Sequence, residues 1–298
     1  MTGLAEAKKL YEEYGIEAIH KAFPDCEERI AVGLAGHGSE CFGFDDELSR
    51  DHDFETGFNL WLTDEDDIKI GPRLMRLYRG LPHGEKSEKS ALGGNARGVM
   101  TIGDFYIRYT GSPGAPECWQ QWMSLPMYAL AEASNGEVFR DDLGEFTKER
   151  NKILAYYPED VRKKKIAARA AEMAQSGQYN FARCMKHGEE GAAKLAAFEF
   201  VRNACDMIFL LNRAYAPYYK WVFKAMENLP ALSGLKADLE AILAGDADKI
   251  EAVSAAVIEE LKRQGLTGGN WDYLEPHAFE VQERIENGEI RSLHIMEG

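Results

Sequence analysis

The chain has 298 residues, of which 45% are hydrophobic and 29% are charged, as in folded globular proteins and unlike disordered or collagen-like chains. Its formal net charge of −15 argues against a protein that coats duplex nucleic acid or an anionic membrane, because both need a large basic surface. The length predicts two domains, each able to bury a core.

The cysteines and the apolar segments indicate in which cellular compartment the protein is expected. The five cysteines have no metal-ligand spacing, and an odd number does not suit a disulfide framework. Residues 1–9 contain no apolar core followed by a cleavage site, and the longest apolar run, Met207–Leu211, is too short for a membrane span. We therefore expect a reduced, cytoplasmic protein that does not enter a membrane.

Hydrophobic periodicity predicts a mixed N-terminal part. Apolar residues recur every three or four positions in two segments, and alternating or continuous apolar runs indicate three strands. A polar, glycine-rich stretch between two of these elements predicts a loop. In chain order we expect a helix over 4–22, strands over 29–36 and 51–62, a helix over 64–78, a loop over 81–98 and a strand over 99–109.

Beyond a turn-rich segment, residues 110–116, nearly every pattern is helical. Ser176-Gly177 is typical of a helix end, as are several proline positions. The predicted fold is therefore α+β, with domains at 1–115 and 116–298. The expected helices of the second domain cover 117–134, 142–155, 159–176, 188–214, 217–228, 233–244 and 246–264.

One pair of motifs carries chemistry. Gly38-Ser39 is followed, after eleven residues, by Asp51-His52-Asp53. Two aspartates at positions i and i+2 of a strand point to the same face, where their carboxylates can share a divalent cation. Magnesium prefers hard oxygen ligands and keeps coordination positions for substrate phosphates. A lone Asp-x-Asp is usually a solvated strand edge, but the conjunction with Gly-Ser is more specific.

The Gly-Ser turn supplies the complementary half of such a site. A glycine lets phosphate oxygens approach the backbone closely, and Ser39 offers a hydroxyl donor. Together the two motifs predict a site for a magnesium–nucleoside triphosphate complex, with Asp51 and Asp53 as metal ligands.

These motifs resemble the core of the DNA polymerase beta-type nucleotidyltransferase superfamily. The longer string from Gly38 to Asp53 resembles a bacterial family of uncharacterised proteins that have a nucleotidyltransferase domain and a helical C-terminal domain, and the likeness covers about residues 5–230. Further matching strings are 135–139, 156–160, 177–183 and 211–221.

The resemblance implies a minimal nucleotidyltransferase sheet with flanking helices, followed by a helical domain that closes the active-site cleft. It implies that Gly38 and Ser39 bind triphosphate and that Asp51 and Asp53 are catalytic ligands of Mg²⁺. The superfamily places a third carboxylate on a later strand, for which Asp104 is the nearby candidate, although an exposed strand-end or helix-cap aspartate explains it as well. A general base could instead come from Glu132, Glu137 or Glu145.

Two groups in the helical part are candidates for nucleotide binding. Asn180 and Arg183 lie within one helical turn of Tyr179, and Lys220 stands in an aromatic segment. These side chains could grip a base and a phosphate, but capping and packing explain them too. A basic run, 162–169, is either a solvated helix face or a surface toward the triphosphate.

The charge is concentrated in one segment. Residues 40–67 contain eleven acidic residues and one basic residue, Arg50, a local charge of −10. An acidic lobe would suit a cationic acceptor, because opposite charges raise its local concentration. The same carboxylates are also needed for magnesium.

The predicted function is magnesium-dependent transfer of a nucleoside monophosphate, AMP from ATP or the equivalent from another nucleotide, to a hydroxyl of a small molecule or protein. Aminoglycoside nucleotidyltransferases resemble this arrangement. The missing strand carboxylate leaves open a catalytically degraded module that binds Mg-ATP and regulates a partner. An antitoxin-like protein adenylyltransferase is a further alternative. No stable nucleic-acid binding is expected.

Overall fold

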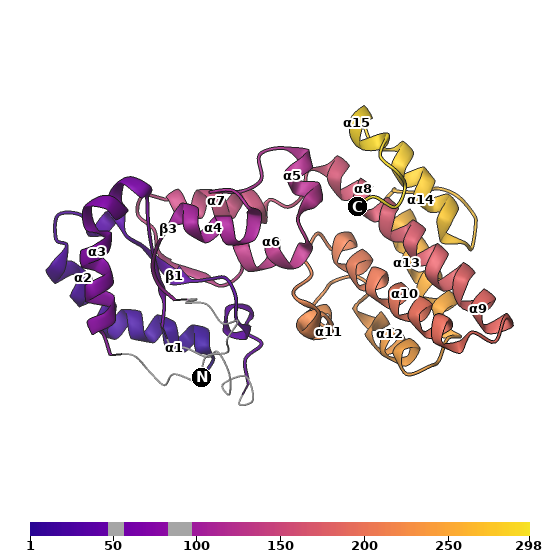
Figure 1. Cartoon of the computed structure of the whole chain (residues 1–298), viewed down its shortest axis with the longest axis horizontal. Coiled ribbons are helices and arrows are strands. Elements are labelled where there is room, and N and C mark those ends of the chain that lie inside the picture. Colours follow the sequence, from indigo (N-terminus) through magenta and orange to yellow (C-terminus); the bar gives the residue numbers. More distant parts are fainter. Residues whose placement is uncertain (47–56, 83–96) are drawn as a thin grey trace. The chain divides into compact units, whose positions relative to one another are not determined.

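The computed structural model describes residues 1–46, 57–82 and 97–298. The chain forms two compact units (Figure 1). The first consists of residues 1–117 and 128–155, and the second of residues 118–127 and 156–298. The sequence suggested one boundary after residue 115, whereas in the structure the segment 128–155 returns to the first unit.

A mixed four-stranded sheet lies at the centre of the first unit. The strand order is β3-β2-β1-β4, with β1 antiparallel to both β2 and β4 and β2 parallel to β3. The sheet and the helices around it confirm the predicted α+β class. The fourth strand was not expected from the sequence. The bounds are Ala31–Leu34 (β1), Asn59–Leu62 (β2), Gly98–Thr101 (β3) and Glu137–Arg140 (β4).

Helices cover both faces of this sheet, and the predicted helices 4–22 and 64–78 are confirmed. A five-residue π-helical turn over Tyr11–Gly15 joins the first two helices into one continuous run. The α-helices of the first unit are α1 (Gly3–Leu10), α2 (Ile16–Ala22), α3 (Asp64–Gly80), α4 (Ile102–Thr110), α6 (Met127–Ser134) and α7 (Glu145–Leu154).

The alternation of side chains along β2 explains why helices pack against both faces of the sheet. Leu60 and Leu62 point to one face and pack with residues of α2 and α3, such as Ile19 and Leu74. Trp61 points to the other face, where its ring stacks on Phe146 of α7 at a centroid distance of 3.8 Å. Because both faces are covered by helices, all four residues of β2 are buried.

The predicted strand 99–109 is wrong beyond Thr101. There the chain turns into α4, and the Thr101 hydroxyl caps the helix by accepting a hydrogen bond from the Asp104 N–H at 2.9 Å. Phe105 and Tyr106 are buried, and Ile102 and Tyr109 complete a spacing of three and four that belongs to a helix. The aromatic, β-branched composition of this segment favoured a strand, but its period is helical.

The second unit is all-helical, as the sequence predicted. No helix among the described residues has both the length and the apolar character to cross a membrane. Its α-helices are α5 (Trp119–Ser124), α8 (Glu159–Met173), α9 (Ala182–Lys186), α10 (Glu190–Leu211), α11 (Val222–Met226), α12 (Lys236–Leu243), α13 (Lys249–Arg263), α14 (Leu274–Glu283) and α15 (Gly288–Arg291).

The helix end predicted at Ser176-Gly177 is also wrong. The chain continues from α8 through a π-helical segment, Ala174–Phe181, into α9. A Cβ atom on Gly177 would collide with the ring of Phe200 on α10. Glycine therefore stands here because a neighbouring helix packs against its backbone, and not because the helix stops.

Candidate functional site

The Gly38-Ser39 motif lies in the connection that follows β1. The strand ends at Leu34, and Ser39 opens a short 3₁₀ helix, Ser39–Phe42. Gly33 of β1 is paired with Asn59 of β2, so the end of β1 and the beginning of β2 share one edge of the sheet. We call residues 36–44 the Gly-Ser turn.

Two side chains from distant segments, Asn135 and Tyr109, hold the backbone of the Gly-Ser turn. Asn135 accepts a hydrogen bond from the Gly36 N–H at 2.7 Å and donates one to the Gly36 carbonyl at 2.8 Å. The hydroxyl of Tyr109 accepts from the His37 N–H at 3.0 Å. Since Tyr109 comes from α4 and Asn135 follows α6, both helices fix where the turn lies.

A buried ion pair supports the turn from within. Arg97 and Glu40 are each 7% exposed, and the Arg97 guanidinium contacts the Glu40 carboxylate. Arg97 also donates to the His37 carbonyl at 3.3 Å and to the Cys41 sulfur at 3.4 Å. Burial opposes its charge, but Cys41 and Glu40 raise the pKa of Arg97 above its ordinary value. Glu40 is thus committed to the architecture of the turn.

The turn has two features that suit a phosphate ligand, a glycine with a positive φ and a serine hydroxyl. Gly38 has a φ of 124°, and a Cβ atom there would approach the Glu40 carboxyl group to 2.5 Å. Only glycine fits this backbone without strain. Ser39 is half-buried, and its hydroxyl makes no hydrogen bond to any described residue. Burial raises the pKa of the neighbouring Cys41 thiol to about 12, so that thiol is not a nucleophile.

Among the three glutamates considered as a base, the structure brings Glu132 to the turn. Glu132 lies on α6, its side chain is 12% exposed, and its Oε1 is 3.3 Å from the Nδ1 of His37. Glu137 is in β4, where Lys8 binds it at 2.5 Å, and Glu145 opens α7 beside Lys148. The sequence named Glu132 but had no means of choosing it.

The predicted metal ligands Asp51 and Asp53 lie outside the described residues. Elsewhere, in residues 1–46, 57–82 and 97–298, no group of three or more His, Cys, Asp or Glu side chains is placed to hold a metal ion. The magnesium site therefore stays a prediction.

The structure does not bring Asp104 to the Gly-Ser turn. Because β3 runs parallel to β2, its final residue, Thr101, pairs with Leu62 at the opposite edge of the sheet from Asn59. Asp104 follows in the first turn of α4, where it is exposed. An acid in the first turn of a helix is stabilised by the helix dipole, which accounts for Asp104 without a catalytic role.

The described acidic residues of the segment 40–67 also lie at different edges of the sheet. Four of its acids, residues 64–67, form the first turn of α3, which begins where β2 ends. Asp66 is buried there and accepts a hydrogen bond from Arg29 at 2.6 Å. These four carboxylates stabilise the start of α3 at the edge away from the Gly-Ser turn.

The predicted nucleotide-binding residues of the second unit are placed as follows. Arg183 is exposed on α9 and donates to the hydroxyl of Tyr179 at 3.2 Å. Asn180 is half-buried in the π-helical segment before α9. Lys220 is exposed, and its ammonium lies 5.0 Å from the centroid of the Trp221 ring. Each cation is thus paired with an aromatic ring.

The two central lysines of the basic run on α8 do not form a solvated face. Lys164 is fully buried and donates to Gln282 at 2.8 Å and to the carbonyls of His294 and Ile295 at 2.7 and 3.0 Å. Lys165, 7% exposed, donates to the Met123 carbonyl at 3.0 Å. These ammonium groups hold the second unit together.

Burial favours the neutral form of both lysines. It lowers the pKa of both Lys164 and Lys165 to about 8, and for Lys165 the nearby Arg169 lowers it further. The ammonium of Lys165 also faces the ring of Tyr157, 5.4 Å from its centroid. The signal available from the sequence was the absence of an amphipathic pattern: alanines surround the lysines on every side of α8.

Comparisons with known proteins match this chain in two ways. The family described as "Domain of unknown function (DUF4037)" matches residues 122–222. Among solved structures, the chain is similar to a "nucleotidyltransferase-like protein from Exiguobacterium sibiricum 255-15", at 12% identity and a TM-score of 0.34, over 94% of this chain and 81% of that one. No curated protein matches the chain. The matched family segment includes Glu132 and α8 but begins after the Gly-Ser turn.

Proposed function

We propose that this chain is a magnesium-dependent nucleotidyltransferase that moves a nucleoside monophosphate, AMP from ATP, to a hydroxyl of a small molecule or protein and releases pyrophosphate. One observation carries the proposal: an unbonded serine hydroxyl and a partly buried glutamate lie at the sheet edge where β2 begins. The sequence places Asp51-x-Asp53 shortly before that strand.

The Gly-Ser turn would bind the triphosphate. The absence of a side chain on Gly38 lets a phosphate oxygen reach the backbone, and the Ser39 hydroxyl can donate to it. The first N–H groups of a helical turn have no acceptor within it, so they add donors. Asn135, Tyr109 and Arg97 hold this geometry before the nucleotide arrives, which reduces the entropic cost of ordering the turn.

Asp51 and Asp53 would hold the magnesium ion. The donor chemistry fits, because carboxylates are the ligands that magnesium prefers, and Glu40 does not compete while it is paired with Arg97. When bound, the ion would neutralise triphosphate charge and polarise the phosphorus that is attacked.

Glu132 would act as the general base. Its carboxylate accepts the proton of the acceptor hydroxyl, the hydroxyl oxygen forms a bond to the α-phosphorus, and the bond from that phosphorus to the bridging oxygen breaks. The electron pair leaves with pyrophosphate. His37, 3.3 Å from Glu132 in the present structure, can orient the carboxylate. Asp104 has no part in this scheme because it belongs to the opposite edge.

In the second unit, Asn180, Arg183 and Lys220 would contribute to nucleotide binding. Arg183 and Lys220 are exposed cations, each near an aromatic ring, Tyr179 or Trp221. Such a pair can stack against a base and bind a phosphate. This assignment is the part of the proposal that rests most on the sequence.

A regulatory module that binds Mg-ATP without turnover is the second candidate. The position of Asp104 favours it, since no acid on β3 or just after it approaches the Gly-Ser turn in the described structure. The two candidates share nucleotide binding and differ in chemistry, so Glu132 distinguishes them.

Calorimetric titration with Mg-ATP tests the binding half of the proposal. Ser39→Ala should weaken binding about tenfold, the loss of one hydrogen bond to a charged group, whereas Asp51→Asn and Asp53→Asn should abolish the magnesium dependence. Asp25→Asn, an exposed acid remote from the motifs in sequence, serves as the matched control. Unchanged magnesium-dependent binding in both aspartate variants would refute the site.

A further inference from the structure

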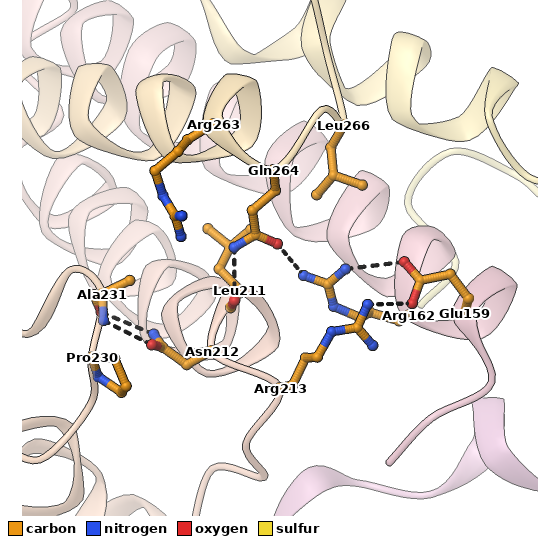
Figure 2. A pocket seen from close by; sticks show the side chains of 10 residues that line it. All are labelled: Glu159, Arg162, Leu211, Asn212, Arg213, Pro230, Ala231, Arg263, Gln264 and Leu266. Carbon is orange, nitrogen blue, oxygen red and sulfur yellow. Dashed lines mark hydrogen bonds and ion pairs between the residues drawn. The ribbon is translucent and has the colours of Figure 1, made fainter. Parts of the chain in front are cut away.

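A pocket of about 460 Å³ opens within the second unit (Figure 2). It is bounded by the start of α8, the end of α10, the segment at Pro230 and Ala231, and the end of α13. Its volume is in the range of pockets that hold small organic ligands. None of the residues that line it takes part in the proposed nucleotidyl transfer.

One wall of the pocket is cationic. Arg162, Arg213 and Arg263 line it together with a single carboxylate, Glu159. Arg162 is buried and donates to the Leu210 carbonyl at 3.0 Å, to Glu159 at 3.1 Å and to the side chain of Gln264. The charge of this buried arginine is thus paired with Glu159, and its nitrogens are satisfied within the protein.

Glu159 does not neutralise this wall. Figure 2 shows its carboxylate between two guanidinium groups, bound by Arg162 at 3.1 Å and by Arg213 at 2.7 Å. In the described structure this is the only hydrogen bond of the Arg213 side chain, so most of its N–H groups are available. Burial and the nearby Arg213 lower the pKa of Arg162, whereas Glu159 raises it.

The backbone directs Arg213 into place. Its φ of 51° is in the left-handed region, which is unfavourable for a side chain of this kind. Hydrogen bonds that close α10, including one from the Ala214 N–H to the Phe209 carbonyl at 3.1 Å, hold this conformation. The end of α10 therefore fixes the backbone from which the Arg213 side chain extends.

Apolar residues also line the pocket, namely Leu211, Leu266 and Pro230. Asn212 anchors the segment after Pro230, since it donates to the Ala231 carbonyl and accepts from the Ala231 N–H, both at 2.9 Å (Figure 2). A ligand that fills this pocket can thus meet both guanidinium groups and hydrocarbon.

We propose that this pocket binds a small organic oxyanion, a phosphate ester or carboxylate with an apolar body, whose anionic group contacts Arg213 and Arg263 and whose body packs on Leu211 and Leu266. Both arginines are exposed enough to adjust, and Arg263 exchanges part of its pairing with Glu260 for the ligand. The pocket lies wholly within the second unit, so the proposal does not depend on the proposed nucleotidyl transfer.

Titration calorimetry with phenyl phosphate at constant ionic strength tests this site. The intact protein should bind one equivalent, and inorganic phosphate, which lacks the apolar body, should bind more weakly. Benzyl alcohol, which lacks the anion, should not bind. Phenylacetate, used in parallel, distinguishes a carboxylate site from a phosphate site. No saturable binding of either anion would overturn the proposal.

Variants locate the binding. Arg213→Gln and Arg263→Gln should each weaken it about tenfold or more, the usual loss for a charge-assisted hydrogen bond. Arg202→Gln is the matched control, because Arg202 is also an exposed arginine paired with a glutamate three residues before it. Asp51→Asn should leave phenyl phosphate binding unchanged. Equal weakening in Arg202→Gln, or loss in Asp51→Asn with none in Arg213→Gln, would contradict the assignment.

Discussion

The two units use buried polar side chains for different ends. In the first unit, Arg97, Asn135 and Tyr109 all contact one short segment, the Gly-Ser turn, and leave its Ser39 hydroxyl open. In the second unit, Lys164 and Lys165 bind carbonyl groups of segments far along the chain. Their hydrogen bonds therefore stabilise the packing of the unit and are not available to a ligand on an open surface.

The contrast separates two kinds of charged cluster that look alike in a sequence. The basic run on α8 has the composition of a phosphate-binding surface, yet its lysines are buried among helices. The Gly-Ser turn has few charges, but its backbone is held on several sides and its Ser39 hydroxyl makes no hydrogen bond to a described residue. A preorganised turn with unused donors is therefore better evidence of a binding site than the number of charges.

The largest expected effect concerns Glu132. If it is the base, Glu132→Gln should reduce transfer of the nucleoside monophosphate by about 10²–10⁴-fold while Mg-ATP binding is retained, because the amide cannot accept the proton. Single-turnover rates and calorimetry on the same preparation measure the two quantities. Glu17→Gln, an exposed glutamate on α2, is the control. Full activity of Glu132→Gln would show that another group is the base, whereas no transfer by the intact protein despite Mg-ATP binding would favour the regulatory candidate.

The next effect concerns the ion pair beneath the turn. Arg97→Met should lower the free energy of unfolding by about 3–5 kcal/mol, because it leaves the buried Glu40 carboxylate unpaired. The double variant Arg97→Met, Glu40→Leu should recover much of that loss, since no charge then remains buried. Urea denaturation measures both. A loss below about 1 kcal/mol in the single variant would show that the turn does not depend on this pair.

A smaller effect, with a defined pH window, concerns Lys165. Its pKa is about 8 in the folded protein, against the ordinary lysine value of 10.5 in the unfolded chain, so between these values the unfolded chain binds more protons and stability rises with pH. From pH 7.5 to 9.5 the intact protein should gain about 2 kcal/mol relative to Lys165→Met. Lys164 titrates in both proteins, so its contribution to the change in stability is the same in each and cancels in the comparison. Lys194→Met, exposed on α10, should show no such gain.

The smallest effect concerns the second unit. If Arg183 contacts the nucleotide, Arg183→Ala should weaken Mg-ATP binding about tenfold, and Lys220→Ala should have a similar effect. Arg202→Ala on α10 is the control. Unchanged affinity in both variants would show that these side chains serve only their contacts with Tyr179 and Trp221.

The local sequence pattern was sufficient to predict much of the fold. The apolar run at β1 and the periodicity of α3 predicted these elements correctly, because burial of one face determines both. Strand β4 could not be predicted in this way, since its four residues are only half-buried and its partner, β1, is about a hundred residues away. The start of α4 was missed because its residues suit a strand by composition.

The candidate site was predictable in its chemistry but not in its assembly. Residue types and spacing selected Gly38, Ser39 and the two aspartates as candidates, and the aspartates stay a prediction. The choice of Glu132 required the contact of α6 with the turn, and the exclusion of Asp104 required the direction of β3. Such relations depend on how segments pair across the sheet, for which a single sequence gives no signal.

The most direct test of the central claim is the fate of labelled phosphorus. The protein is incubated with magnesium and ATP labelled at either the α- or the γ-phosphorus, in the presence of small-molecule or protein extracts as acceptor. The account predicts that α-label appears on an acceptor and that γ-label leaves only as pyrophosphate, both lost in Asp53→Asn. Transfer of γ-label to the acceptor would contradict nucleotidyl transfer and identify a kinase.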